Sequence, residues 1–215
     1  MKSKKTDWLR FWWVLLYAPV YMIIFFLEEK YITDCHLIGI PLDHKIPFIE
    51  WFFFPYYIWF PFIAAVVARL FFKDKVTFLK TAGFLYFGMT IFLIVNVVYP
   101  NRLDIRPTEF TRDNIAIRLA QAMYEGDTPT NVLPSIHVYN SLGVLIGVWA
   151  TKKDMKRKAV KWSVTILSIV ISCSTVFVKQ HSVIDVIAAF VLAVPAYWIF
   201  FKGAYARKMD SLETD

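Results

Sequence analysis

The sequence predicts an all-α membrane protein, a bundle of six transmembrane helices with both termini in the cytoplasm. Of its 215 residues, 58% are apolar and only 19% are charged, whereas soluble proteins are roughly half apolar and about a quarter charged. The apolar residues fall in long uncharged runs, which is the pattern of membrane spans. Lysine and arginine collect in alternate links between these runs.

Six apolar runs approach the length that crosses a bilayer, because a helix rises about 1.5 Å per residue and needs about 20 residues. They cover residues 11–27, 51–72, 82–99, 133–151, 162–178 and 183–201. No small-residue cleavage site follows the first run, so we expect a retained helix rather than a signal peptide. The second run holds Pro55 and Pro61 in its outer half, and the third has no charged residue.

The last three runs and the links between them complete the predicted organisation. The fourth run contains His137 near its start, the fifth contains Cys173 as a packing residue, and the sixth contains Asp185 near its start. No link is long enough for a separate globular domain and the chain has no internal repeat. We therefore expect a single integral membrane domain over residues 1–215.

The distribution of lysine and arginine predicts the orientation, because cytoplasmic links are enriched in both residues. Seventeen of the 24 lie in four stretches, residues 2–10, 69–80, 152–161 and 202–208. With six spans, these stretches share one side of the membrane with both termini. The loops 28–50, 100–132 and 179–182 should then face the outside of the cell.

Composition excludes several other classes of protein. The net charge of +7 does not indicate nucleic-acid binding, because the basic residues form short clusters between apolar runs. Cys35 and Cys173 are too few and too far apart for a disulfide framework or a metal site. We expect no metal and no cofactor, and we interpret His36 and His44 as polar residues of the membrane interface.

Three motifs in the outward-facing segments bring reactive side chains to one face of the membrane. They are Arg106-Pro107, Pro134-Ser135-Ile136-His137 and the pair His181 and Asp185. The last two are spaced i, i+4 and share a helix face. An aspartate that holds one imidazole N–H fixes the tautomer and leaves the other nitrogen free to attack. An ionisable residue inside an apolar run, such as Asp185, is a functional candidate by default.

The other motif residues suit complementary tasks. A second histidine, His137, can protonate a leaving alkoxide. Arg106 can hold phosphate oxygens in a bidentate way, and Ser135 at a helix start can add a donor. Each motif alone has a plainer interpretation, because a lone histidine is more often an interface residue and an i, i+4 pair can be a helix cap. The occurrence of all three motifs on one face of six spans favours a catalytic site over these plainer interpretations.

These motifs resemble those of the type 2 phosphatidic acid phosphatase (PAP2) superfamily, which are K-x6-R-P, P-S-G-H and S-R-x5-H-x3-D. Arg106-Pro107 matches the first and Pro134 to His137 match the second. Ser174-Thr175 followed by His181 and Asp185 match the third with the right spacing. The resemblance covers the six-span layout and the motifs from about residue 99 to 190, and it implies the PAP2 type of helical bundle.

Three positions depart from the family pattern. Tyr99 stands at the lysine of the first motif, Ile136 at the glycine of the second and Thr175 at the arginine of the third. The nearest substitutes for the two missing cations are Arg102 and Lys179. This variation is similar to the branch that includes inositolphosphotransferase-like and sphingomyelin-synthase-like proteins.

The resemblance implies a role for each residue. His181 would be the nucleophile that forms a phosphohistidine, Asp185 would orient it, and His137 would be the acid and later the base. The substrate phosphate would be bound by Arg106 and Ser135, with Arg102, Lys179 and Thr175 as weaker candidates. No metal would be needed, because positioning and charge stabilisation carry phosphoryl transfer.

The function expected first is a multi-pass cell-membrane phosphatase that hydrolyses phosphomonoester or pyrophosphate lipids at the outer face. One alternative is a phosphotransferase that moves a phospho-headgroup between lipids. A third, of another class, is a non-catalytic transporter or binding protein on the same scaffold. Phosphatidate, phosphatidylglycerol phosphate and polyprenyl phosphates all remain open as substrates. The expected partners are the lipid phosphate substrate and membrane lipids, with the oligomeric state left open.

Overall fold

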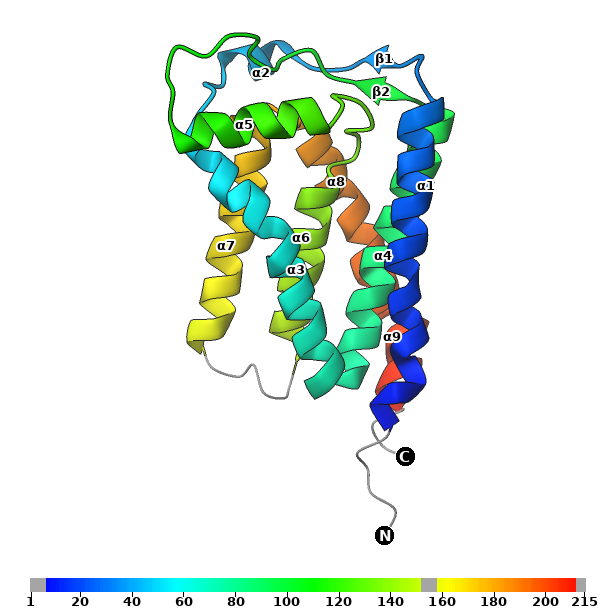
Figure 1. Cartoon of the computed structure of the whole chain (residues 1–215). Coiled ribbons are helices and arrows are strands. Elements are labelled where there is room, and N and C mark those ends of the chain that lie inside the picture. Colours follow the sequence, from blue (N-terminus) through cyan, green and yellow to red (C-terminus); the bar gives the residue numbers. More distant parts are fainter. Residues whose placement is uncertain (1–6, 152–157, 212–215) are drawn as a thin grey trace.

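The computed structural model describes residues 7–151 and 158–211, and this part of the chain is mostly helical (Figure 1). Most helices stand side by side as a bundle, and one, α5, lies across an end of it. In chain order the elements are the 3₁₀ helix η1 (Asp7–Leu16), α1 (Tyr17–Tyr31), β1 (His36–Leu37), α2 (Pro41–Lys45), the 3₁₀ turn η2 (Glu50–Phe52), α3 (Phe53–Lys73), α4 (Lys75–Val98), β2 (Asn101–Arg102), α5 (Ile115–Gly126), α6 (Ile136–Ala150), α7 (Lys158–Phe177), α8 (Val183–Tyr197), the π-helical turn η3 (Trp198–Lys202) and α9 (Ala204–Ser211).

Five helical stretches are long and apolar enough to cross a membrane. They are Phe11–Tyr31, Glu50–Lys73, Lys75–Val98, Lys158–Phe177 and Val183–Ser211. The sixth expected span corresponds to α6, which has 15 residues and is about 22 Å long at 1.5 Å per residue. Length and composition thus support a multi-pass membrane protein, with α6 shorter than its neighbours.

The third span begins earlier than the sequence predicts. We expected it to start at residue 82, whereas α4 starts at Lys75, after the N-cap Asp74 accepts the Thr77 N–H at 3.1 Å. Lys80 was therefore wrongly assigned to a link. Its ammonium lies 2.6 Å from the Asp210 carboxylate on α9, and this ion pair lets a mostly buried lysine lie inside the helix. The predicted orientation partly depends on the lysines and arginines within residues 2–5 and 152–157. These two stretches lie outside the described residues.

The loops that we expected to face outside gather at one end of the bundle, here called the cap end (Figure 1). Strands β1 and β2 pair in parallel there, and α2 and α5 lie beside them. Helix α5 was not foreseen, although Asn114 caps it by accepting the Ile117 N–H at 3.0 Å. The opposite end, where η1 begins and α9 ends, is here called the terminal end.

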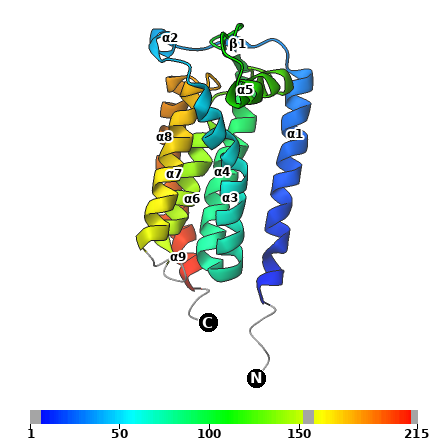
Figure 2. The same cartoon turned by 60° about the vertical axis from the view of Figure 1, so that its left-hand side comes forward.

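Helix α1 stands at the edge of the bundle and packs on α4 (Figure 2). Two tyrosines join the helices, because Tyr17 donates to the Tyr86 carbonyl at 3.2 Å and Tyr86 donates to the Val14 carbonyl at 2.8 Å. Nearer the cap end, the Asn96 amide donates to the buried Glu28 carboxylate at 3.1 Å. Polar contacts across an apolar interface fix the register of the two helices.

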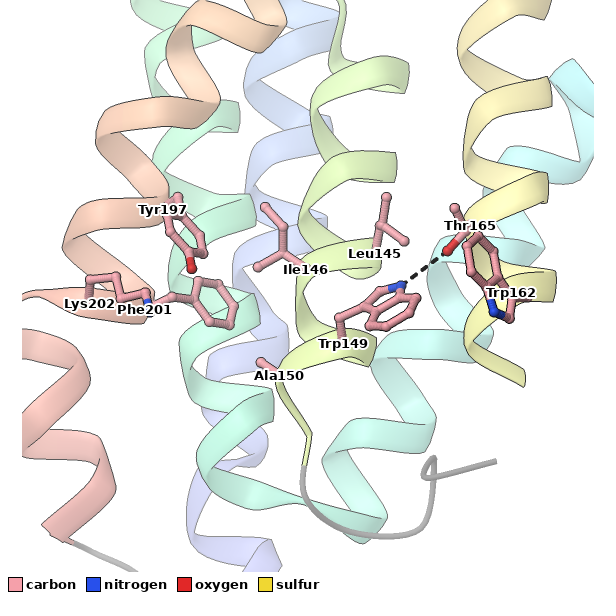
Figure 3. Close-up of a pocket in the computed structure, with 9 residues that line it drawn as sticks. All are labelled: Leu145, Ile146, Trp149, Ala150, Trp162, Thr165, Tyr197, Phe201 and Lys202. Carbon is pink, nitrogen blue, oxygen red and sulfur yellow. Dashed lines mark hydrogen bonds between the residues drawn. The ribbon is translucent and has the colours of Figure 1, made fainter. Parts of the chain in front are cut away.

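Helix α6 is the centre of the bundle and packs against α3, α4, α7 and α8. Its last turn, around Trp149, lies between α7 and the α8–η3 helix (Figure 3).

Toward α4, Gly143 and Gly147 of α6 allow a close approach. A Cβ on Gly143 would lie 2.6 Å from Leu85, and one on Gly147 would lie 2.4 Å from Thr81. Small residues four apart are a common means of close helix packing in membranes.

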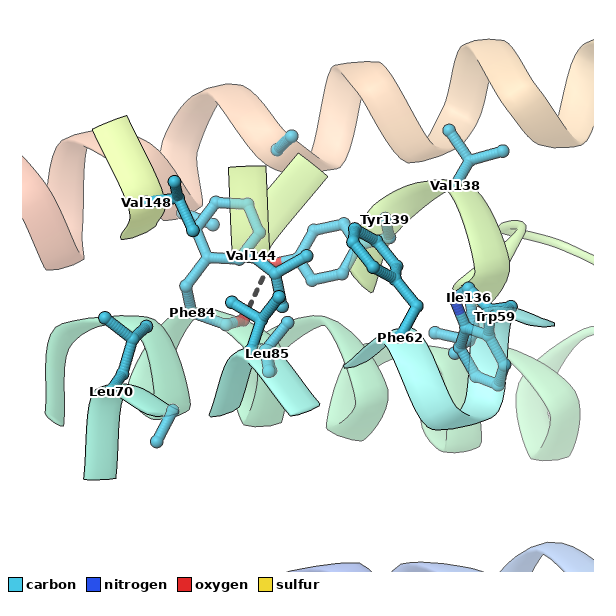
Figure 4. Packing of buried hydrophobic residues seen from close by; sticks show 14 of the residues in the cluster. Trp59, Phe62, Leu70, Phe84, Leu85, Ile136, Val138, Tyr139, Val144 and Val148 are labelled. Atoms are coloured by element: carbon cyan, nitrogen blue, oxygen red, sulfur yellow. Dashed lines mark hydrogen bonds between the residues drawn. The ribbon is translucent and has the colours of Figure 1, made fainter. Parts of the chain in front are cut away.

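The α4–α6 interface is also held by a buried aromatic pair (Figure 4). Tyr139 stacks on Phe84 with ring centroids 4.7 Å apart, and its hydroxyl donates to the Phe84 carbonyl at 2.8 Å. Both side chains are fully buried. A buried tyrosine that satisfies its hydroxyl in this way fixes the depth and rotation of α6, and hence the position of His137 at its start.

Candidate functional site

The start of α8 places His181 and Asp185 together. Ser182 is the N-cap of this helix, and its backbone N–H donates to Asp185 Oδ2 at 2.8 Å. His181 directly precedes the cap, and its Nδ1 lies 3.4 Å from the same Oδ2. Both side chains are buried. The carboxylate is thus held by the helix terminus and faces one ring nitrogen, as expected for an orienting group.

The start of α6 places His137 against the other nitrogen of His181. His137 Nδ1 lies 3.4 Å from His181 Nε2, and the rings are in an edge-to-face arrangement with centroids 5.5 Å apart. The His137 ring also packs against Tyr56 and Trp59 of α3, with centroid distances of 4.5 and 4.2 Å. Asp185, His181 and His137 therefore form a continuous line.

A backbone hydrogen bond joins the two helix starts. The Ser135 N–H donates to the Asp185 carbonyl at 3.1 Å, and Ser135 Oγ accepts the Val138 N–H at 3.4 Å as the N-cap of α6. Ser135 therefore positions both histidines. Its backbone N–H is already used, while its hydroxyl keeps a proton that it can donate.

Arg106 approaches the same place from the loop after β2. Its guanidinium donates to the Asp127 carbonyl at 2.7 Å, to the Thr128 carbonyl at 3.1 Å and to the side-chain oxygen of Gln180 at 2.5 Å. It also lies 4.8 Å from the centre of the Tyr124 ring. Gln180 directly precedes His181 in the chain, so the hydrogen bond to Gln180 connects Arg106 to the residue next to His181.

Burial shifts the ionisation of this arginine and of its acidic neighbour. Desolvation lowers the pKa of Arg106, and the nearby Asp127 carboxylate opposes that change. Desolvation likewise raises the pKa of Asp127, opposed by the charges of Arg106 and His181. The Asp127 carboxylate lies 3.4 Å from the guanidinium. A substrate phosphate would compete with this carboxylate for Arg106.

Lys179 points toward α2. Its ammonium donates to the carbonyls of Asp43 and Ile46, both at 2.5 Å, and its side chain is buried. Its backbone has a φ of 57°, an uncommon value for a residue other than glycine. Burial lowers its pKa, and Asp43 opposes that change. In this arrangement Lys179 anchors α2 to the α7–α8 turn.

Thr175 and Arg102 occupy structural positions. The Thr175 hydroxyl donates to the Ser172 carbonyl of its own helix at 2.8 Å, and the Thr175 carbonyl accepts the His181 N–H at 3.0 Å. Thr175 therefore shapes the turn that carries His181. Arg102 lies exposed on β2 at the cap end, with its charge near Cys35.

No pattern in the sequence pointed to Asp43, which is almost completely buried against the start of α8. Its Oδ2 accepts the Ser182 hydroxyl at 2.6 Å and the Ile40 N–H at 2.8 Å, while Oδ1 accepts the Val183 N–H at 2.9 Å. An acidic residue three positions after Ile40 suggests only a local turn. The contact with α8 joins residues about 140 positions apart, which no local pattern reveals.

Gln180 was also missed. Its side chain is 3% exposed, its oxygen accepts from Arg106, and its Nε2 has no partner among the described residues. A buried amide donor without a partner is uncommon and needs an explanation. The one signal in the sequence was its position next to His181. The unpartnered amide beside that residue in the chain makes Gln180 a candidate ligand of a substrate oxygen.

The remaining histidines lie away from this cluster. His36 and His44 are exposed at the cap end, and the His36 ring stacks on Tyr99 with centroids 4.8 Å apart. Tyr99, at the position of the family lysine, therefore faces β1. Within residues 7–151 and 158–211, no group of three His, Cys, Asp or Glu side chains is arranged to hold a metal ion.

Among known proteins, the chain resembles one family. No curated protein and no solved structure gives a significant match to the chain. The sequence model of the PAP2 superfamily matches residues 84–209, more than half of the chain, from within α4 to α9. This range contains His137, His181, Asp185 and Arg106. The chain therefore belongs to the PAP2 superfamily, whose members are phosphatases and phosphotransferases.

Proposed function

We propose that this protein is a membrane lipid phosphate phosphatase that acts through a phosphohistidine on His181. The observation that carries the proposal is the line of Asp185, His181 and His137, with 3.4 Å between the facing atoms at each step. One nitrogen of His181 faces the carboxylate and the other faces a second histidine. That arrangement suits a nucleophile with an orienting group behind it and an acid in front of it.

In the first half-reaction, His181 Nε2 attacks phosphorus and forms a P–N bond while the P–O bond to the lipid alcohol breaks. Asp185 stabilises the positive charge that develops on the ring. His137 Nδ1, on the reacting side, donates its proton to the leaving oxygen. The two nitrogens are only 3.4 Å apart, so a phosphoryl group fits between them only after the rings separate.

In the second half-reaction, a water molecule attacks the phosphohistidine. His137, now neutral, accepts a proton from that water, the P–N bond breaks, and inorganic phosphate leaves with His181 restored. The same residue thus serves as acid and then as base, as microscopic reversibility requires.

Arg106 and Gln180 are the groups that we assign to the phosphoryl oxygens. The guanidinium supplies a charged donor, and the unpartnered Gln180 Nε2 supplies a neutral one beside His181. Ser135 Oγ is a third donor. Lys179 and Arg102 are weaker candidates, because the first donates to α2 carbonyls and the second lies exposed on β2. Thr175 contributes through its backbone.

A phosphotransferase is the second candidate, and one specific observation favours it. His181 is only 6% exposed. Helix α5 lies across the cap end (Figure 1), and its Tyr124 donates to the Val178 carbonyl at 2.7 Å. A site that limits water would favour transfer of the phosphoryl group to a second lipid alcohol. The first half-reaction is the same in both candidates.

The proposed setting is the outer face of the cell membrane, with six spans and the cap end outside. The excess of lysine and arginine near the terminal end supports this orientation. The shorter α6 is enclosed by four helices, so it needs less apolar length than a helix that faces lipid.

The decisive experiment incubates the purified protein with phosphatidate whose phosphate is labelled. We expect labelled inorganic phosphate and a labelled histidine that is stable to base, whereas a new labelled lipid would indicate transfer. His181→Ala should abolish turnover, and Asp185→Asn should lower it by about 10⁴-fold, as in serine proteases that lose the orienting aspartate.

His36→Ala is the matched control, because it removes an exposed imidazole at the same end of the bundle. It should retain wild-type turnover. A wild-type protein that turns over none of the lipid phosphates, monoester or diester, while still binding them, would support the non-catalytic alternative and overturn the proposal.

A further inference from the structure

A groove of about 590 Å³ lies near the terminal end, and none of the histidines lines it (Figure 3). Its floor is the last two turns of α6, including Leu145 and Trp149, and its walls are α7 and the α8–η3 helix. Helices α7 and α8 each pack on α6, so α6 forms the floor of the groove between them. The volume is in the range typical of small-molecule sites.

Aromatic rings line the groove on both sides. Trp149 and Trp162 meet edge to face with centroids 5.8 Å apart, and Trp149 Nε1 donates to Thr165 at 3.1 Å. On the other side, Tyr197 stacks on Phe201 with centroids 5.9 Å apart. Tryptophan and tyrosine prefer the membrane interface, so this groove lies where acyl chains meet headgroups.

The π-helical turn η3 brings a lysine to the same groove. In an α-helix, residues three and four apart share a face, so Lys202 would point away from Tyr197. A π-helix bonds residue i to i+5, which returns Lys202 to the face of Tyr197, 5.9 Å from its ring centre. Such turns occur often at functional sites. Figure 3 shows Lys202 beside Phe201 at the edge of the groove.

The charge around the groove is positive. Lys161 lies 5.2 Å from the ring centre of Trp149, and Lys158 is one turn away on α7. Among the described residues that follow η3, Asp210 is the only acidic one, and it pairs with Lys80. An apolar, aromatic groove with cations at its mouth is complementary to a lipid that carries an anionic headgroup.

We propose that this groove is a binding site for an anionic phospholipid of the leaflet at the terminal end. One acyl chain lies along Leu145 and Ile146, between the tryptophan and tyrosine walls, and the headgroup phosphate pairs with Lys202. The site is separate from the histidine cluster and does not depend on the proposed reaction.

The test uses the purified full-length chain and native mass spectrometry with equimolar phosphatidylglycerol and phosphatidylcholine. Wild type should retain phosphatidylglycerol preferentially. Lys202→Ala should weaken that preference about fivefold, equivalent to the ~1 kcal/mol of one lysine near a charged lipid surface. Lys202→Arg should restore it. Ile146→Trp, which fills the floor of the groove, should lower retention of both lipids.

Two matched controls separate this site from the rest of the protein. Lys208→Ala removes an exposed lysine of α9 that does not line the groove, and it should keep the preference. Arg106→Ala removes the cation beside the histidines and should keep it as well. Equal retention of the two lipids by wild type, or equal losses in Lys202→Ala and Lys208→Ala, would mean annular lipid only and would overturn the proposal. A dimer that Ile146→Trp dissociates without changing lipid retention would overturn it too.

Discussion

At the scale of single residues, the site depends on which nitrogen each histidine presents. Asp185 faces Nδ1 of His181, so Nε2 is the nitrogen left to react, and His137 presents Nδ1 to it. Tyr56 and Trp59 pack against the His137 ring, and Trp59 Nε1 donates to the His137 carbonyl at 3.1 Å. Two histidines in direct contact can have different roles because their other neighbours differ.

The role of His137 as an acid predicts a dependence on the leaving group. His137→Ala should lower kcat by roughly 10²- to 10⁴-fold for a lipid alcohol, which needs a proton to leave. The loss should be much smaller for a nitrophenyl phosphate, whose leaving group is stable without one. Steady-state kinetics on both substrates measure the difference. Equal losses would contradict the role, and Trp59→Phe controls for altered packing.

The pair of Arg106 and Asp127 predicts a pH dependence of KM. Burial raises the pKa of Asp127, so the carboxylate becomes neutral at a higher pH than usual as the pH falls. A neutral Asp127 no longer competes with phosphate for Arg106, whereas a charged one does. The ratio of wild-type KM to the KM of Asp127→Asn should therefore be near one at low pH and rise with pH.

Comparing the two proteins at each pH cancels the ionisation of the substrate itself. Asp104→Asn, which changes an exposed aspartate of the same cap-end loops, should show a ratio that does not change with pH. A ratio for Asp127→Asn that stays constant would show that the carboxylate does not oppose substrate binding.

At the scale of elements, the short helix α2 acts as a clamp on the start of α8. Asp43 accepts hydrogen bonds from Ser182 and Val183, and Lys179 donates to two carbonyls of the α2 segment. An acidic side chain at a helix N-terminus is also favoured by the helix dipole. The loop 28–50 thus fixes the helix end that carries His181, although it contributes no reacting group.

This clamp predicts that Asp43 is a positioning residue. Asp43→Ala should lower kcat about tenfold or more, since a hydrogen bond to a charged group contributes roughly 1.5–3 kcal/mol, and KM should change little because Asp43 lies behind the helix start. Asp43→Asn keeps an acceptor for the Val183 N–H and should fall between. Asp104→Ala is the matched control. A kcat for Asp43→Ala equal to that of the control, in a folded protein, would exclude the role.

At the scale of the whole molecule, the described chain starts and ends at the same end of the bundle, opposite the cap (Figures 1 and 2). The six crossings that we propose would produce that arrangement, and α6 is the helix among them that length alone leaves out. Helix α6 is surrounded by α3, α4, α7 and α8. Most of its surface therefore contacts protein rather than lipid, and it needs less apolar length than they do. The histidine cluster lies at the cap end, whereas the aromatic groove with Lys202 lies near the terminal end.

The topology predicts which engineered cysteines react from outside. In a chain with Cys35→Ser and Cys173→Ser, Glu125→Cys on α5 should react with a membrane-impermeant maleimide on intact cells. Lys208→Cys on α9 should react only after the membrane is permeabilised. Both positions are exposed, so access to thiols is comparable. The reverse pattern, or labelling of both from one side, would contradict six crossings with the cap end outside.

The sequence by itself determined the helical class, the approximate spans and the spacing of the residues that we propose as catalytic. Long apolar runs must become helices in a bilayer, because no water is present to satisfy backbone groups. His137, His181, Asp185 and Arg106 stand in recognisable spacings, so their proximity could be expected before any coordinates. The start of α4 could not be predicted, because Lys80 lies inside the helix only with its ion-pair partner Asp210 on α9.

The tertiary structure alone decided what the loops and cations do. It turned Lys179 toward α2, placed Asp43 against α8, and brought the side-chain oxygen of Gln180 to Arg106. It also formed the groove whose floor contains Trp149, which requires three helices and a π-turn. The physical reason is that such contacts join residues far apart in the chain, where local periodicity carries no information. The sequence therefore singles out the residues that we propose to react, and the packing of the bundle decides which other groups can reach them.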